Sequence, residues 1–459
     1  MSLWTSVEIE QATGGKALGN WSVDGIEIDS REIQNGDLFL ALKAARDGHE
    51  FVAGAIAKGA GAAMVSHIPE GCENLPLIIV DDVDKALAAM GQARRHAVNA
   101  QTIAVTGSAG KTSTKEMLLT VLSSFGKTHA SVRSFNNHLG VPITLARMPK
   151  DADFAVFEIG MNAPGEIAPL VAQVQPEIAI ITNVAPVHLA GFDNEMGIAK
   201  EKAAIFSGLS ENGTGLVFGD MEYTDYILST TDKNIKTFGE KPASGFKLIK
   251  VSEFSERTES QIEINSHIFD MKIHASGRHH AMNGTAVMGA IAALGLDLPQ
   301  ALKAMECWVA PAGRGEHHNV TIDGKNIQVI DESYNANPLS MKATLASFIQ
   351  TDAKRLIAIL GEMGELGPKS PQFHKEIALS PAVEKIDQFI TVGENMKYLR
   401  SELKEAQKLA HFDTTEGLLD FIKVNLEEGD AILLKASNYM GLGKTVDALV
   451  KLGQSDDIH

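Results

Sequence analysis

A glycine-rich segment in the first half of the chain constrains the fold most. Residues 106–114 read TGSAGKTST, after the short apolar run QTIAV and before TKEMLLTVLSSF, whose apolar residues recur at helical spacing. A loop between a buried strand and a helix suits a phosphate cradle, because glycines allow backbone N–H groups to approach an anion, Lys111 reaches terminal phosphates and the Thr112 hydroxyl can hold Mg²⁺. Val105 stands where the longer motif has its first glycine, so the match is to G-x-x-G-K-T. An ordinary glycine-rich turn is the alternative.

The composition is that of a globular chain with several domains. The chain has 459 residues, 44% hydrophobic and 22% charged, which is too long for one core. A formal net charge of −17 argues against a general binder of nucleic acid or anionic membranes, because either needs a basic face. Residues 281–296 are too short and too polar to predict a membrane span, and the N-terminus lacks a signal-peptide pattern. We therefore expect a cytoplasmic protein, with Cys72 and Cys307 as buried thiols.

Strands and helices alternate around the glycine loop. We expect strands at 101–105, 153–160, 177–183 and 215–219, and helices at 114–125, from about Gly165 and around 195–207. Continuous apolar strands between helices indicate a parallel sheet that is covered on both faces. Residues 246–275 break this rhythm, with alternating stretches such as 260–275 that predict antiparallel strands, and a small-residue helix follows from about 279.

Further α/β units are expected on both sides of this one. The first would contain strands at 37–42, 62–66 and 77–82, a small-residue helix at 51–62, and an outgoing helix at 84–100. The last would begin near Gly313 with a hairpin that turns at Asp323 and Gly324, followed by strands at 356–361, 388–393 and 431–437. No Pro/Ser-rich linker separates the units, so we expect closely hinged domains.

Several polar residues follow the predicted strands and could complete a site. Glu158 ends a strand at the sheet edge that faces the ligand in open α/β folds, where a carboxylate is a natural Mg²⁺ ligand beside Thr112. His188 follows the next strand, although a lone histidine is more often a hydrogen-bonded loop residue. Lys200 and Lys202 lie on a predicted helix, where a solvated face is the simplest interpretation.

More polar groups cluster toward the last unit. They include Asn283, Arg314 and the segment DESYNANP at 331–338. An arginine at a domain junction suits a phosphate or carboxylate, and a structural ion pair is the alternative. Histidine pairs occur at 279–280 and 317–318, but adjacent side chains are expected to point in different directions, which disfavours metal binding.

Together these segments resemble the Mur ligases, ATP-dependent amide-forming enzymes of peptidoglycan precursor synthesis. TGSAGKTST is similar to their phosphate loop, FEIG at 157–160 to their Mg²⁺ glutamate segment and TNVAPVH at 182–188 to their metal-binding histidine segment. Lys202 falls where the family carries a carbamylated lysine, an N6-carboxylysine. Arg314 and DESYNANP match the family's junction between central and C-terminal domains, and the resemblance covers nearly the whole chain.

The resemblance implies an α/β fold of three domains. Residues 1–82 would form a small α/β UDP-binding domain, 83–312 a central P-loop-type parallel-sheet ATPase domain, and 313–459 a C-terminal Rossmann-like α/β domain. The DSR triplet at 29–31 is similar to the UDP-binding domain shared by the tripeptide-forming and D-alanyl-D-alanine-adding members. SFNNHLGVPITL and AILGEMGELG are similar specifically to the members that add D-alanyl-D-alanine to UDP-N-acetylmuramoyl-tripeptide. These two compounds are therefore the expected substrates of a monomeric enzyme with no nucleic acid partner and no membrane insertion.

The resemblance also implies residue roles. ATP would contact Thr106, Gly107, Ser108, Ala109, Gly110, Lys111, Thr112, Ser113, Asn283, Arg314, Asp331 and Asn335. The catalytic residues would be Lys111, Glu158, His188, Lys202 and Arg314, with Mg²⁺ held by Thr112, Glu158, His188 and the carbamate of Lys202. Substrate contacts would come from Ser30 and Arg31 for UDP, Asn136 and Asn137 for the muramoyl peptide, and Lys435 and Ser437 for the dipeptide.

Carbamylation requires a neutral amine, so Lys202 must be desolvated or close to other cations. Three other interpretations stay open at this point. A folylpolyglutamate synthase or diamino-acid-adding ligase is the nearest, although the DSR and NNHLGVP segments disfavour them. A P-loop ATPase that drives a change in a macromolecular partner, and a non-catalytic nucleotide sensor, are the others.

Overall fold

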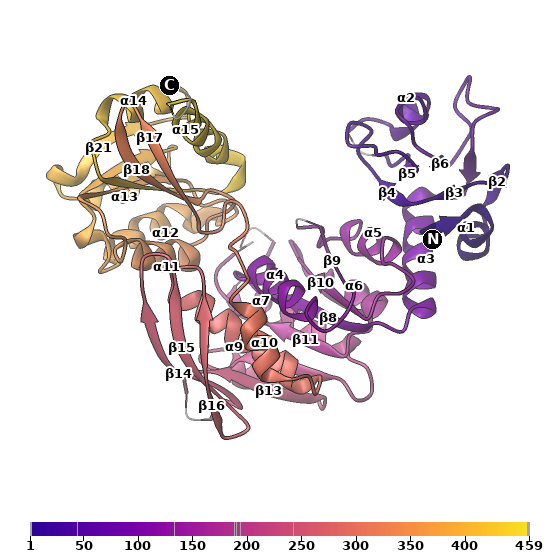
Figure 1. Ribbon diagram of the computed structural model, residues 1–459, viewed down its shortest axis with the longest axis horizontal. Helices are drawn as coiled ribbons and strands as arrows, with labels where there is room; N and C mark the ends of the chain where they lie inside the picture. Colours follow the sequence, from indigo (N-terminus) through magenta and orange to yellow (C-terminus); the bar gives the residue numbers. More distant parts are fainter. Residues whose placement is uncertain are drawn as a thin grey trace.

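The computed structural model describes residues 2–43, 45–132, 134–187, 189, 191–192, 194–241 and 243–456. Three large sheets follow one another along the described chain, and Figure 1 shows their units as a purple N-terminal, a magenta central and a yellow-orange C-terminal body. The central unit lies between the other two. The predicted α/β fold is confirmed, and the boundaries predicted after residues 82 and 312 fall between these sheets.

The N-terminal unit is a five-stranded sheet. Its order is β2-β7-β6-β5-β4, with bounds Lys16–Leu18, Leu77–Ile79, Ala62–Val65, Asp37–Leu40 and Gly25–Glu27. A separate pair joins β1 (Trp4–Thr5) to β3 (Ser22–Val23), and α1 spans Ser6–Thr13. The helix predicted at 51–62 is shorter than expected: α2 covers only Val52–Ala57, because Gly59 adopts φ +113, outside the helical region, before β6 begins.

Helix α3 (Val83–Ala97) joins the first two units. Its buried side chains, including Leu87 and Met90, share one apolar cluster with the N-terminal strands and with Ile143 of α5 (Gly140–Ala146). Hydrogen bonds reinforce this contact, because Arg147 Nε donates to the Ile26 carbonyl at 2.8 Å and Trp4 Nε1 donates to the Ala146 carbonyl at 2.8 Å. The N-terminal unit is therefore held to the central unit by both apolar packing and polar contacts.

The central unit is a nine-stranded sheet. Its order is β16-β15-β14-β13-β12-β11-β8-β10-β9, with bounds His267–Ile273, Thr258–Ile264, Phe246–Glu253, Asn234–Gly239, Thr214–Phe218, Ile178–Ile181, Gln101–Thr106, Phe154–Glu158 and Thr128–Ala130. Strands β8 to β14 pair in parallel, while β14, β15 and β16 pair antiparallel, as the sequence predicted. Strands β9 and β13 were not predicted.

Helices cover both faces of the central sheet. One apolar cluster joins Ile103 and Val105 to α4 (Lys111–Leu122), α9 (Arg278–Ala293) and α10 (Leu298–Met305). The other joins Ala104 to α5, α6 (Ile167–Val174) and α7 (Glu195–Ala203), which is followed by η2 (Ala204–Gly208). Alternate residues of β8 therefore pack on opposite faces, as expected for a buried parallel strand.

The C-terminal unit is a six-stranded sheet. Its order is β17-β18-β22-β19-β20-β21, with bounds Glu316–Ile322, Lys325–Glu332, Asp430–Lys435, Arg355–Gly361, Gln388–Val392 and Lys408–Phe412. The predicted hairpin is present, since β17 and β18 pair antiparallel around Asp323 (φ 49) and Gly324 (φ 72). Its faces are covered by α11 (Pro338–Phe348), α12 (Ser370–Glu376) and α13 (Met396–Glu402) on one side, and by α14 (Leu418–Asn425) and α15 (Leu442–Asp456) on the other.

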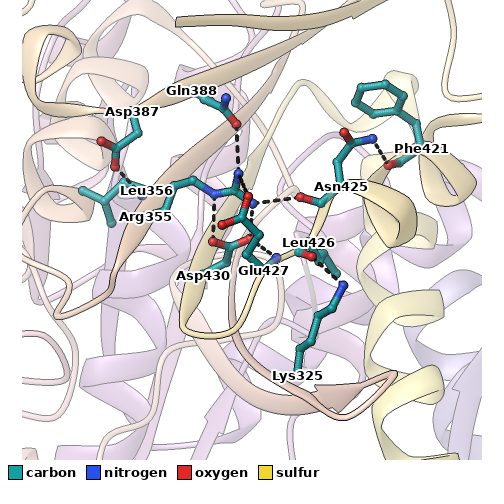
Figure 2. Close-up of polar contacts among 10 residues, drawn as sticks. All are labelled: Lys325, Arg355, Leu356, Asp387, Gln388, Phe421, Asn425, Leu426, Glu427 and Asp430. Atoms are coloured by element: carbon teal, nitrogen blue, oxygen red, sulfur yellow. Dashed lines mark hydrogen bonds and ion pairs between the residues drawn. The ribbon is translucent and has the colours of Figure 1, made fainter.

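A polar network joins the amino ends of β19, β20 and β22, which begin at Arg355, Gln388 and Asp430 (Figure 2). Arg355, at the start of β19, donates from Nε and Nη2 to the two carboxylate oxygens of Asp430 at 2.9 and 2.6 Å. It also contacts Glu427 Oε1 at 2.8 Å and the Asn425 carbonyl at 2.8 Å. This network lies at the amino ends of the strands, whereas Lys435 lies at the carboxyl end of β22.

Two expectations about solvent contact can be compared with the structure. Cys72 is buried, but Cys307 is exposed, so the prediction of two buried thiols is wrong for Cys307, which lies in the segment after α10. Within the described part of the chain, no helix is long and apolar enough to cross a membrane.

Candidate active site

The glycine loop lies between β8 and the first turn of α4. Gly107 and Gly110 adopt φ +155 and +81. A Cβ atom on Gly107 would lie 1.8 Å from Thr182 Oγ1, and one on Gly110 would lie 2.9 Å from Asn283 Oδ1. Both positions therefore exclude a side chain. The first backbone N–H groups of α4, which follow the loop, have no partners within the helix and can bind a phosphate.

The loop is held from the neighbouring strand β11. Thr182 Oγ1 donates to the Ala109 carbonyl at 2.5 Å, and Asn183 Oδ1 accepts from the Ala109 amide at 2.8 Å. Ser108 Oγ donates to the Ala185 carbonyl at 3.0 Å. Thr182 and Asn183 were not predicted as site residues, although they follow a buried strand, which is the signal that could have found them. Thr106, the last residue of β8, is fully buried.

Lys111 opens α4 and is half-buried. Its Nζ donates to the Gly107 carbonyl at 2.7 Å. Burial lowers the pKa of Lys111, Glu158 opposes this shift, and the positive charge of Arg314 adds to it. The amino group therefore stands where the glycine loop, a buried carboxylate and a second cation come together.

Glu158 ends β10 and is 1% exposed. Thr112 Oγ1 donates to Glu158 Oε2 at 2.7 Å, and Asn136 Nδ2 donates to Glu158 Oε1 at 2.7 Å. Asn136 was predicted as a substrate contact, and in this structure its amide contacts Glu158. Asn137 is exposed, and its Oδ1 accepts from the Gly140 amide at 2.9 Å at the start of α5.

Lys202 lies on α7 and is 2% exposed, so the interpretation as a solvated face is wrong for this residue, whereas Lys200 is exposed. Burial, and next the charge of Lys111, lower the pKa of Lys202 well below its usual value. Its neighbour Glu201 accepts hydrogen bonds from two backbone amides at the start of α6, Gly165 N and Ile167 N, each at 2.7 Å. His188 lies outside the described residues.

The C-terminal unit contributes Arg314 and the turn after β18. The Arg314 guanidinium carbon lies 4.1 Å from the ring centroid of Tyr334. Asp331, a predicted ATP contact, accepts at Oδ2 from the Gly313 amide at 3.0 Å and at Oδ1 from the Ser333 amide at 2.9 Å, so both of its carboxylate oxygens hold the local backbone. An arginine stacked on an aromatic face keeps its N–H donors available at the ring's edges.

Lys435 and Ser437, predicted to contact the dipeptide, form hydrogen bonds within the C-terminal unit. Lys435 is 2% exposed, and its Nζ contacts Glu332 Oε2 at 3.1 Å and the Asn335 carbonyl at 3.0 Å. Ser437 Oγ accepts from the Gly364 amide at 2.7 Å. The pair therefore shapes one wall of the junction between the two units.

These groups surround a cavity of about 510 Å³ between the central and C-terminal units. The predicted site residues that line it are Ser108, Ala109, Gly110, Lys111, Thr112, Ser113, Asn136, Asn137, Glu158, Asn283, Arg314, Asn335, Lys435 and Ser437. Lys202 and Asp331 are buried and do not line the cavity. The arrangement gathers cations and backbone N–H groups from two units around one space, as the transfer of a charged group requires.

Comparison with known proteins identifies the family. Three protein-family models match consecutive stretches: "Mur ligase family, catalytic domain" at residues 22–109, "Mur ligase middle domain" at 105–292 and "Mur ligase, glutamate ligase domain" at 313–438. A relative from Rickettsia prowazekii (strain Madrid E), named UDP-N-acetylmuramoyl-tripeptide--D-alanyl-D-alanine ligase, is 35% identical over 97% of this chain and 99% of its own length. The chain belongs to the Mur ligase family.

Other relatives of this Mur ligase agree with the assignment. A protein of the same name from Bacillus subtilis (strain 168) is 33% identical over 94% of this chain and 93% of its own length. A crystal structure described as MurF from Acinetobacter baumannii is 29% identical and covers 98% of this chain and 99% of its own, with a TM-score of 0.86. The likeness therefore extends through all three units.

Ser30 and Arg31, predicted to contact UDP, belong to the N-terminal unit and lie outside the lining of this cavity; Arg31 pairs with Asp29 at 2.6 Å. The rings of His279 and His280 lie 4.0 Å apart, so the expectation that adjacent side chains diverge is wrong here. Both histidines line the cavity, and burial lowers the pKa of each, which favours the neutral rings.

Proposed function

We propose that this Mur ligase joins D-alanyl-D-alanine to UDP-N-acetylmuramoyl-tripeptide through an amide bond, with conversion of ATP to ADP and phosphate. The observation that carries the proposal is the near-full-length likeness to relatives that bear this name. The cavity supports it, because Lys111 and Arg314 come from different units and face the same space. Two anionic reactants that must meet need such cations.

The proposed reaction follows from the weakness of a carboxylate as an electrophile. The terminal carboxylate of the tripeptide attacks the γ-phosphorus of ATP, the bond to ADP breaks, and an acyl phosphate forms. The free amine of the dipeptide then attacks the acyl carbon, loses a proton, and phosphate leaves. Lys111 and Arg314 offset the negative charge that both steps accumulate, and the backbone N–H groups of the glycine loop hold the phosphates in line.

The donor set at Glu158 fits a magnesium ion. The Thr112 hydroxyl and the Glu158 carboxylate are oxygen donors 2.7 Å apart, of the type that Mg²⁺ prefers. A bound Mg²⁺ would neutralise phosphate charge and orient the transferred group. Asn136 would help to place Glu158, because its amide already contacts that carboxylate at 2.7 Å. His188 is proposed as a further ligand on the family resemblance alone.

The burial of Lys202 supports a carbamate on its amine. A neutral amine adds to carbon dioxide and loses a proton, which converts a cation into an anion. The depressed pKa of Lys202 favours the neutral amine that this reaction needs. The resulting anion would offset the charge of Lys111 and help to hold a cation.

The remaining assignments follow the division of the chain. We place UDP on residues 1–82 through Ser30 and Arg31, ATP on residues 83–312 with Asn283 near adenine, and the dipeptide on residues 313–459. Asn136, Asn137, Asp331, Asn335, Lys435 and Ser437 keep the roles proposed from the resemblance, with Lys435 acting through Glu332. Because it would use ATP and a UDP-linked substrate, we propose that the enzyme acts in the cytoplasm. We also propose that it is a monomer.

The test is ADP release with Mg²⁺, UDP-N-acetylmuramoyl-tripeptide and D-alanyl-D-alanine, omitting each in turn, with mass spectrometry of the UDP product. We expect release to need both substrates and the product to gain one dipeptide less water. Lys111→Met should abolish release, whereas Lys250→Met, the same change at an exposed position on β14, should not. ADP release that is independent of both substrates, and stimulated by a macromolecule, would instead support a partner-driving ATPase.

A further inference from the structure

Tyr334 connects the central and C-terminal units at the cavity. It lies in the turn after β18, lines the cavity and is half-buried. Its hydroxyl donates to Ser134 Oγ at 2.8 Å, although the two residues are 200 positions apart in the chain. Ser134 belongs to the segment between β9 and α5 that also carries Asn136 and Asn137.

The ring of Tyr334 supports Arg314. The guanidinium carbon lies 4.1 Å from the ring centroid, within the range of a cation–π contact. The backbone brings the two together, since the Tyr334 amide donates to the Gly313 carbonyl at 3.1 Å. Gly313 adopts φ +73, and a Cβ atom there would lie 2.8 Å from Tyr334 Cβ, so only glycine permits this close approach.

The segment on the other side of Tyr334 leads to the phosphate loop. Asn136 donates to one oxygen of Glu158 at 2.7 Å, and Thr112 of the phosphate loop donates to the other oxygen at 2.7 Å. Tyr334 therefore contacts Arg314 through its ring and Ser134 through its hydroxyl. Arg314 faces the cavity, and Ser134 belongs to the segment that contains Asn136, a hydrogen-bond partner of Glu158. Nothing in the amide-forming chemistry described above uses the Tyr334 hydroxyl.

We propose that Tyr334 is a positioning residue that makes the placement of Arg314 depend on the state of the 134–137 segment. The inference rests on the proposed function, in which this segment binds the muramoyl peptide and Arg314 meets the phosphates. Ser134 fixes the Tyr334 hydroxyl and the ring holds Arg314 toward the nucleotide, so a UDP substrate that binds the segment stabilises this arrangement. Binding of the two substrates is thereby coupled, each tightening the other by the same factor.

The experiment measures the dissociation constant of a non-hydrolysable ATP analogue with and without UDP-N-acetylmuramoyl-tripeptide, for the full chain with Mg²⁺. Tyr334→Phe removes the hydroxyl and keeps the ring. We expect the tightening by the UDP substrate to fall about five-fold, the value of one ordinary hydrogen bond, with the dissociation constant of the analogue alone unchanged. Ser134→Ala should give the same loss, and the double variant no further loss, because both remove one interaction.

Two controls separate this role from a general structural one. Tyr398→Phe makes the same change on a half-exposed tyrosine of α13 and should leave the coupling intact. Tyr334→Leu removes the ring as well and should weaken binding of the analogue alone, as expected if the ring holds Arg314.

Unchanged coupling in both single variants, or additive losses in the double variant, would overturn the inference. These results leave the proposed function intact as long as the wild-type chain binds the UDP substrate and forms product. If the wild-type chain neither binds that substrate nor forms product, the proposed function fails and the inference fails with it.

Discussion

Two carboxylates contact the same guanidinium in the C-terminal unit but differ in burial, which predicts very different effects of removing them. Asp430 receives hydrogen bonds from Arg355 Nε and Nη2, and its side chain is 1% exposed (Figure 2). Glu427 contacts Arg355 Nη1 at 2.8 Å, and its side chain is 71% exposed. Hydrogen bonding to Asp430 is the main cause that raises the pKa of Arg355, so the guanidinium stays charged.

Asp430→Asn should destabilise the C-terminal unit by about 3 kcal/mol, the lower end for breaking a buried ion pair, because Glu427 and the Asn425 carbonyl still contact Arg355. Glu427→Gln should cost less than about 1 kcal/mol, since an exposed pair is screened by water. At about 2–4 °C per kcal/mol, the shifts in Tm would be roughly 6–12 °C and less than about 4 °C.

The assay is thermal unfolding by calorimetry and near-ultraviolet circular dichroism, at low and high salt. Salt should change the stability of the Asp430 pair little, because a buried pair is poorly screened. Both variants should keep wild-type turnover at 25 °C, since the network lies at the strand ends opposite to Lys435. Equal Tm shifts for the two variants, or a larger shift for Glu427→Gln, would refute the reasoning from burial.

Three further outcomes are expected. Gly107→Ala should abolish nucleotide binding in calorimetric titrations, because its Cβ would lie 1.8 Å from Thr182 Oγ1 and the loop would have to move; wild-type affinity would contradict this. Lys202→Ala should lower kcat roughly 10- to 100-fold, as for residues that orient a metal ligand, with no recovery in bicarbonate, whereas Lys200→Ala on the exposed face of the same helix should have wild-type kcat. Full activity of Lys202→Ala would exclude the carbamate role. Burial lowers the pKa of His129 to about 4, so the unfolded chain binds a proton more readily than the folded chain. The contribution of His129 to the free energy of unfolding should therefore be constant above about pH 6.5 and should fall as the pH drops from 6.5 to 4. His129→Gln should reduce this pH dependence in urea unfolding, and an unchanged pH dependence would contradict the prediction.

The elements that the sequence predicted well are those with a local signature. Strands β8, β10 and β11 are short apolar runs, the β17–β18 hairpin turns at Asp-Gly, and β15 and β16 alternate in polarity. The unpredicted strands β9, β13 and β21 lack such a signature, because most of their residues are only partly buried or exposed, so their sequences carry no continuous apolar run. The helix predicted at 51–62 is shorter than expected because Gly59 adopts φ +113, which ends the helix within a favourable run of small residues.

The sequence by itself determined the chemistry of the site, and only the tertiary structure decided how each group is used. Residue identity and spacing were enough to propose a phosphate loop, a carboxylate at a strand end and an arginine at a domain junction. Burial is a sum over contacts from many segments, so the sequence alone favoured a solvated Lys202, which is 2% exposed. The contacts of Asn136 with Glu158 and of Tyr334 with Ser134 likewise join residues far apart in the chain. No local pattern encodes such distances, because they arise only when the chain has folded and the central and C-terminal units pack around one cavity.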